Sequence, residues 1–200
     1  DWKHGQRYNS PDTAVPVTVY HSPAELGLKV TMFDLVSGDS FQRQFAIKRK
    51  AGSPVKKAEL VAYENFNPVA TRKPMLPMVD WCLTWLSDQS AAYNPKSKAI
   101  LNWWSGVDEA TGKPTSVALA MGFDGKVTGH QVGTDGFDPG SDPNGPEDAW
   151  HQLQDSPYRL GGATRADGQT TGAISTRLRF DRAGRATARF TVAAGETRAQ

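Results

Sequence analysis

The sequence is short of cysteine, of long apolar runs and of helical repeats. Its 200 residues include one cysteine, Cys82, so neither an intrachain disulfide nor a thiolate pair for zinc can form. No apolar run approaches the roughly 18 residues that a membrane-spanning helix needs. We therefore expect a fold that depends neither on cysteine chemistry nor on a membrane.

Net charge is also small. Lys and Arg number 23 and Asp and Glu 21, which leaves +2 at pH 7 and does not indicate a nucleic-acid partner. Basic residues do gather in two clusters, but they alternate with apolar residues, which predicts solvated sheet faces rather than a phosphate-binding stripe. The clusters are Lys48, Arg49, Lys50, Lys56 and Lys57, and Arg177, Arg179, Arg182, Arg185 and Arg189.

The chain does contain a clear hydrophobic period of two. In SFQRQFAIK, Phe41, Phe45 and Ile47 share one face, and GRATARFTVAAG alternates in the same way. Turn sequences such as SGDS, AGSP and DRAG separate the strand candidates. The pattern predicts a single domain, residues 1–200, with an all-β, two-sheet antiparallel β-sandwich fold. Further strand candidates begin at Val15, Gly27, Pro54, Asp80, Lys98, Thr115 and Ala173.

The stretch GTDGFDPGSDPNGPEDAW holds five acidic residues and no basic ones. We expect a long acidic loop over residues 133–147 and a short helix over 147–155. The stretch does not match an EF-hand calcium loop, because the first and twelfth positions, which need oxygen-bearing side chains, are Gly140 and His151. Loose calcium binding by the loop aspartates remains an alternative to a solvated loop, which is favoured. The four histidines lack ligand spacing, so we predict no metal site and no cofactor.

Carboxylates offer no catalytic pair in the sequence. Glycoside hydrolysis usually needs two carboxyl groups about 5 to 9.5 Å apart, whereas most acidic residues here fall in turns or at strand ends. Glu64, in YENFNP, is the exception because it shares a strand face with apolar residues. A buried partner such as Arg43 or Arg72 is favoured over a catalytic role for Glu64. We predict no catalytic residues in this chain.

The tryptophans are the candidate substrate-binding residues. Trp81, Trp85 and Trp103 could stack on sugar rings, since an indole offers a flat apolar face and an N–H donor. Trp81 and Trp85 would share one face of a strand, while the adjacent Trp103 and Trp104 must point to opposite faces. Packing between sheets or against a neighbouring domain is the favoured alternative.

A family resemblance rests on three segments. TVYHSPAELGLKVTMFDLV is followed by DSFQRQFAIKRKAGSPVKKAELVAYENFNPV, and later by EDAWHQLQDSPYRLGGATRADGQTTGAISTRLRFDRAGRATARFTVAAGET. Together they resemble the N-terminal super-sandwich, a galactose mutarotase-like β-sandwich, of bacterial glucoamylases, glucodextranases and related enzymes of glycoside hydrolase family fifteen. The resemblance covers roughly Val15 to Thr197.

In that family the sandwich precedes an α/α toroid that carries two catalytic glutamates. The resemblance therefore implies a toroid partner in another chain or segment, a glucan-type ligand, and a secreted or periplasmic bacterial location rather than the cytoplasm. The opening DWKHGQRYNSPDTAV runs straight into what looks like the middle of the fold, and the chain starts at Asp1. We thus expect a removed segment or another chain to complete the sheets, whose edges would otherwise expose unpaired backbone groups.

These observations predict the non-catalytic sandwich portion of a glucan-cleaving glycoside hydrolase. A free-standing carbohydrate-binding sandwich is the alternative. A third reading is a sandwich lyase or epimerase that works from the concave face of a sheet.

Overall fold

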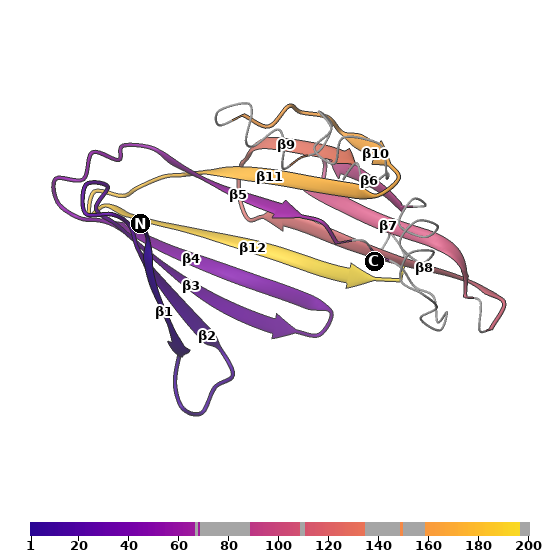
Figure 1. The fold of residues 1–200 in the computed structure, drawn as a ribbon, viewed down its shortest axis with the longest axis horizontal. Helices are drawn as coiled ribbons and strands as arrows, with labels where there is room; N and C mark the ends of the chain where they lie inside the picture. Colours follow the sequence, from indigo (N-terminus) through magenta and orange to yellow (C-terminus); the bar gives the residue numbers. More distant parts are fainter. Residues whose placement is uncertain (67, 69–88, 109–110, 135–148, 150–158, 197–200) are drawn as a thin grey trace.

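Twelve β-strands make up the regular structure of the computed structural model, which describes residues 1–66, 68, 89–108, 111–134, 149 and 159–196 (Figure 1). Among these residues, no helix is both long and apolar enough to cross a membrane. The strands are β1 (Lys3–Tyr8), β2 (Pro16–His21), β3 (Leu28–Ser37), β4 (Ser40–Arg49), β5 (Ala58–Glu64), β6 (Gln89–Asn94), β7 (Ala99–Asp108), β8 (Lys113–Phe123), β9 (Val127–Thr134), β10 (Arg165–Asp167), β11 (Thr170–Leu178) and β12 (Arg185–Gly195).

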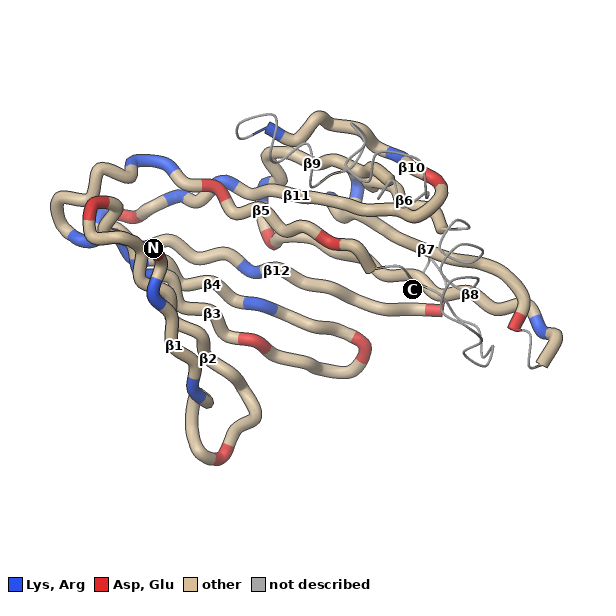
Figure 2. The backbone as a smooth tube through the Cα atoms, viewed as in Figure 1, with Lys and Arg blue, Asp and Glu red and all other residues tan. Residues whose placement is uncertain are grey.

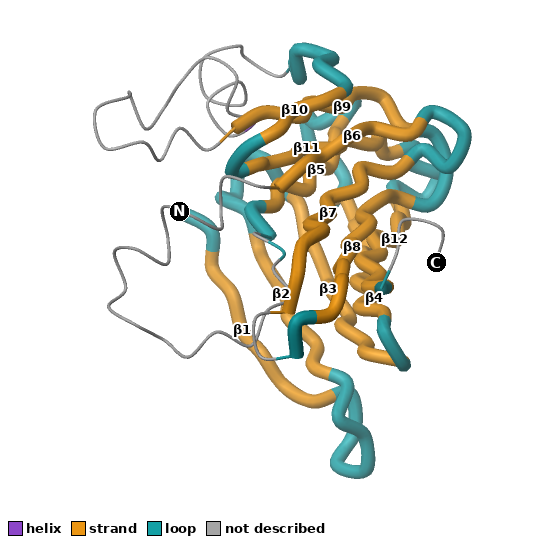
Figure 3. Tube along the Cα trace, turned by 90° about the vertical axis from the view of Figure 1, so that its right-hand side faces the viewer, coloured by secondary structure: helices purple, strands orange, loops and turns teal. Residues whose placement is uncertain are grey.

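The strands form two antiparallel sheets. The large sheet has nine strands in the order β1-β2-β3-β4-β12-β8-β7-β6-β10, and the small sheet has three in the order β5-β11-β9. Figures 1 and 3 show the small sheet lying against one part of the large sheet, with β1 and β2 on the far side from it. The predicted all-β fold with two antiparallel sheets is confirmed.

Alternating side chains explain why β4 and β12 pair. Ala186 lies opposite Ile47 and Ala188 opposite Phe45, so the apolar faces of both strands turn the same way. β12 then pairs with β8 along its second half, which inserts the last strand of the chain between β4 and β8. The large sheet is therefore a meander that is interrupted by β12, a strand far from both of its neighbours in the sequence.

The core lies where β11 crosses the large sheet. Ile100, Met121 and Ile174 are at most 1% exposed and pack together between the layers. A second apolar cluster contains Ile47 of β4 and Leu178 of β11, and both residues lie near the C-terminal ends of their strands. Burial of these aliphatic side chains is the main force that holds the two sheets face to face.

One row of apolar residues shows where the small sheet stops covering the large one. Val36, Phe41, Val192, Met121 and Ile100 lie directly opposite one another across β3, β4, β12, β8 and β7. Ile100 is fully buried, whereas Val36 at the other end is 73% exposed. The apolar inner face of the large sheet thus continues beyond its cover.

Four strands were not predicted. β1 is exposed at all six positions and has no apolar alternation, while β10 is only three residues long. The sequences of β6 and β9, QSAAYN and VTGHQVGT, combine small, polar and glycine residues, which weakens the hydrophobic signal. The strand candidate at Asp80 lies outside the described residues. So do residues 135–147 of the acidic loop and all of the expected helix except residue 149.

Candidate functional site

The adjacent tryptophans of β7 point to opposite faces of the large sheet, as predicted. Trp104 is 6% exposed and faces the interior, where its ring occupies the space that a side chain at Gly106 would need. Trp103 is half-buried on the outer face. The other two predicted substrate-binding residues, Trp81 and Trp85, lie outside the described residues.

Trp103 belongs to a straight row of residues on three neighbouring strands. Asp167 of β10 lies opposite Ser90 of β6, which lies opposite Trp103 of β7. The Ser90 hydroxyl donates a hydrogen bond of 2.6 Å to Asp167 Oδ1. Arg165 binds both oxygens of Asp167, at 3.2 Å from Nε and 3.1 Å from Nη2, and its guanidinium carbon lies 5.9 Å from the centre of the Trp103 ring. The Arg165–Asp167 ion pair, which also binds Ser90, therefore lies beside the aromatic ring of Trp103.

Glu64 forms a second polar cluster, between the sheets. It is 4% exposed, on the inner side of β5 that Leu60 shares, as its strand position predicted. Its Oε2 accepts a hydrogen bond of 2.9 Å from the Phe66 amide. Buried Asn102 also faces it, and the Thr170 hydroxyl donates to Asn102 Oδ1 at 3.3 Å. Burial raises the pKa of Glu64 to about 7, against the smaller opposing effects of Phe66 and Asn102.

The partner expected for Glu64 is not Arg43. That guanidinium makes a two-pronged ion pair with Asp34, with Nε to Oδ1 at 2.6 Å and Nη2 to Oδ2 at 2.7 Å. The cross-strand register explains this, because Asp34 and Arg43 lie directly opposite one another on β3 and β4. Arg72 lies outside the described residues.

Several buried polar side-chain atoms between the sheets have no hydrogen-bond partner within the described part of the chain. They are Glu64 Oε1, Asn102 Nδ2, His130 Nε2 and both polar side-chain atoms of Gln89. Gln89 lies opposite Trp104, so it belongs to the same inner face. Among the residues that the structure describes, the polar groups around Glu64 are thus amides and, through Asn102, a hydroxyl, and no second carboxylate faces it as an acid pair for glycoside hydrolysis would require.

An imidazole also lies in the interface between the sheets. The ring of His130 stacks on that of Tyr93, with centroids 3.8 Å apart and planes 9° from parallel. Desolvation lowers the pKa of His130, and a hydrogen bond to the Gly162 backbone partly opposes this. This pair joins β9 to β6 and is a packing contact.

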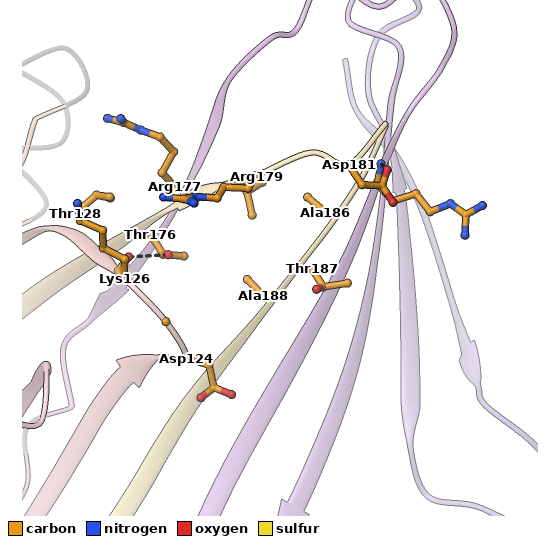
Figure 4. A pocket seen from close by; sticks show the side chains of 13 residues that line it. Asp124, Lys126, Thr128, Thr176, Arg177, Arg179, Asp181, Ala186, Thr187 and Ala188 are labelled. Atoms are coloured by element: carbon orange, nitrogen blue, oxygen red, sulfur yellow. Dashed lines mark hydrogen bonds between the residues drawn. The ribbon is translucent and has the colours of Figure 1, made fainter. Parts of the chain in front are cut away.

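The two basic clusters form no concentrated patch. Figure 2 shows basic and acidic positions interspersed along the chain, and all five arginines of the second cluster are exposed. Some of these arginines line a hollow of about 790 Å³ between β12 and the ends of β9 and β11 (Figure 4). Arg177 extends away from the hollow, and the bond drawn there runs from the Thr176 hydroxyl to the Lys126 carbonyl at 3.0 Å. We assign no ligand to it.

No cluster of three or more His, Cys, Asp or Glu side chains suited to a metal occurs among the residues that the structure describes. The loop aspartates that were weighed as calcium ligands, Asp135, Asp138 and Asp142, lie outside those residues.

Sequence reasoning missed Ser90, Arg165 and Asp167. β10 is too short to show a period, and its pairing with β6 joins residues 77 positions apart, Ser90 and Asp167. The one available signal is the sequence RAD followed by Gly168, an arginine and an aspartate two residues apart that must share a strand face.

Comparison with known proteins shows a likeness of fold. No family model matches the sequence, and no curated protein matches it. Among solved structures, a bacterial glucoamylase complexed with acarbose matches with a TM-score of 0.57 and 10% sequence identity. The match covers 100% of this chain and 24% of that one. The chain thus has a glucoamylase-like β-sandwich fold and spans about a quarter of the length of that glucoamylase chain.

Proposed function

We propose that this chain is the non-catalytic β-sandwich portion of a glycoside hydrolase that cleaves glucans or oligosaccharides. In this proposal it packs against an α/α-toroid catalytic domain, supplied by another chain or segment. The fold likeness to part of a glucoamylase supports the enzyme class. The role of the chain is to brace the catalytic domain and help shape its cleft.

The observation that carries this proposal is the apolar row that leaves the core. Its residues pass from Ile100, which is fully buried, to Val36, which is 73% exposed. The Phe41 ring next to Val36 is half-buried beneath the Arg43 guanidinium, whose central carbon lies 5.4 Å from the ring centre. Apolar residues that continue a core into solvent are typical of a surface that another domain covers.

The described carboxylates support a non-catalytic role. Asp34, on the same inner face, is held by Arg43, and Glu64 faces amide groups. Glu59 accepts hydrogen bonds from the Ser175 and Thr128 hydroxyls. Each of these three carboxylates thus contacts hydroxyl, amide or guanidinium groups, and none of the three faces another described carboxylate as an acid and base pair would.

Purification of the tagged chain from its native source tests the proposal. We expect a helical glycoside hydrolase polypeptide to accompany it, and Val36→Lys to abolish the association. Val61→Lys is the matched control, because Val61 is also exposed, at 44%, but lies on the outer face of the small sheet. A solitary 21.7 kDa species with no glycosidase partner would refute the proposal.

Carbohydrate binding by the free chain is the second candidate function. The observation that favours it is the outer-face position of Trp103 beside Ser90, Arg165 and Asp167. Aromatic faces bordered by fixed hydrogen-bonding groups are suited to sugars. Binding to starch or dextran by the isolated chain would support this function.

A further inference from the structure

We propose that the outer face of the large sheet, across β1, β2, β3, β4 and β12, binds a linear polysaccharide that carries carboxylate or sulfate groups. Basic side chains of these five strands neutralise the anionic groups, and a groove beside them holds the chain. This inference goes beyond the proposed function, because Val36 and the rest of the apolar row lie on the inner face of the same sheet.

One cross-strand row on the outer face consists of basic residues. In order across the sheet they are Lys3, His21, Lys29, Lys48 and Arg185, each directly opposite the next. Lys48 follows Ile47, whose side chain lies in the core, so this basic row points the other way. All five residues are exposed. Neighbouring strands are about 4.8 Å apart, so the basic row extends about 19 Å across five adjacent strands (Figure 1).

The charges of the basic row are not compensated within the described part of the chain. None of the five side chains forms an ion pair there. One carboxylate, that of Asp181, reaches the end of the row, but it accepts its hydrogen bond of 2.8 Å from the backbone amide of Arg185. Like charges directly opposite one another destabilise a sheet, and Lys48 has such a neighbour on each side. An anionic ligand relieves this repulsion.

A row of short side chains runs beside the basic row, two residues further along each strand. Its members are Gly5, Val19, Thr31, Ala46 and Thr187. A third row follows on the same face and contains the longer side chains of Arg7, Phe33, Gln44 and Arg189. Successive rows are about 7 Å apart, so the short side chains form the floor of a groove between two taller rows. The space above Gly5 is open, since a Cβ atom there would have no neighbour within 4 Å.

Two hollows lie along this outer groove. One of about 380 Å³ lies over β1 and β2, where Lys3, Gly5 and Arg7 are among its lining residues. Another of about 390 Å³ lies at the β12 end, lined by Ala46 and Thr187 of the floor among others. Asp124 also lines the second hollow, where it binds Arg189 Nε at 3.3 Å. The free positive charges therefore lie in the basic row and at the β1 end.

The composition of the outer groove favours a polysaccharide over a nucleic acid. Proteins that bind single-stranded nucleic acids stack the bases on several aromatic side chains. Phe33 is the one Phe, Tyr or Trp in the three rows, and it is half-buried. The floor instead offers the hydroxyls of Thr31 and Thr187, each of which can both donate to and accept from a sugar hydroxyl. A linear acidic polysaccharide repeats its anionic groups along one direction, as the basic row repeats its charges.

Titration of the purified chain with polygalacturonate, dextran sulfate and neutral dextran tests the inference. We expect saturable binding to at least one of the two anionic polymers. The affinity should fall steeply as the salt concentration rises, because neutralising a polyanion releases its bound counterions. Neutral dextran separates this attraction from contacts with sugar rings alone, so any binding to it should not change in the variants of the basic row.

Lys29→Gln combined with Lys48→Gln should weaken binding to the anionic polymer about tenfold or more and reduce its salt dependence, because two adjacent charges leave the basic row. Lys96→Gln combined with Lys113→Gln is the matched control. It removes the same charge from exposed positions in the β6–β7 turn and at the start of β8, and it should bind like the wild type. The unfolding temperature of the basic-row variant should be no lower than that of the wild type, because a repulsion is removed.

Absence of binding to both anionic polymers at low salt would overturn the inference. Equal weakening by the two double variants would also contradict it, since net charge and not the basic row would then attract the polymer. Tighter binding to a single-stranded oligonucleotide than to either polysaccharide would show that the ligand is a nucleic acid. Association with a helical glycoside hydrolase polypeptide is measured separately and concerns the inner face, so either proposal can fail while the other stands.

Discussion

The carboxyl group of Glu64 lies against Gly172, the residue opposite it on the neighbouring strand. A Cβ atom at Gly172 would come within 2.6 Å of Glu64 Oε1 and 3.1 Å of Ile100 Cγ2. The absence of a side chain at position 172 therefore provides the space in which a carboxyl group is held between the two sheets.

Replacing Gly172 by Ala should destabilise the protein by about 1 to 3 kcal/mol, because the added methyl group meets both the carboxyl group and the core. Chemical denaturation measures the change in the free energy of unfolding. Gly5→Ala is the control, since a Cβ atom there has no neighbour within 4 Å. Equal effects of the two substitutions would show that the close contact at Gly172 does not exist.

Glu64 should make stability depend on pH. Its pKa in the folded protein, about 7, is above the ordinary value of 4.5, so the folded state binds the proton more tightly than the unfolded state. The contribution of Glu64 to stability is therefore fully present below about pH 4.5 and is lost as the pH rises from about 4.5 to about 7, by on the order of 3 kcal/mol.

Glu64→Gln should remove this fall, because an amide does not ionise. Unfolding free energies of both proteins across this pH range check the prediction. A wild-type profile with the same slope as Glu64→Gln would mean that Glu64 titrates normally in the folded state.

His130 should act in the opposite direction. Its lowered pKa means that the folded state binds the imidazole proton less tightly than the unfolded state, so stability is complete above about pH 6.5 and is lost as the pH falls below it. His130→Phe keeps a ring that can pack on Tyr93 and should remove this acid-side loss. An unchanged slope in the variant would contradict the desolvation of His130; NMR titration of the imidazole provides an independent check.

Local patterning was sufficient to predict much of the fold. Alternation in β4 and β12 and the turns between strands follow from side-chain period and turn chemistry, which act over a few residues. The opposed directions of Trp103 and Trp104 follow in the same way. The exposure of the five arginines in the second basic cluster was predicted from the same periodicity.

Pairing between distant segments could not be predicted from period alone. Nothing local to β12 specifies insertion between β4 and β8, and nothing local to β10 places Asp167 opposite Ser90. Arg43 was a sensible partner for Glu64 by charge, but the register of β3 and β4 gives it Asp34 instead. These outcomes depend on which strands pair and in which register, and both are decided by the burial of whole sheet faces.

A hydrolysis assay of the purified 200-residue chain tests the central claim most directly. With malto-oligosaccharides and dextran, across acidic and neutral pH, we expect no sugar release above the buffer blank, because the described residues hold no facing acid pair. Turnover by this chain alone, abolished by Glu64→Gln in a variant that remains folded, would contradict the account.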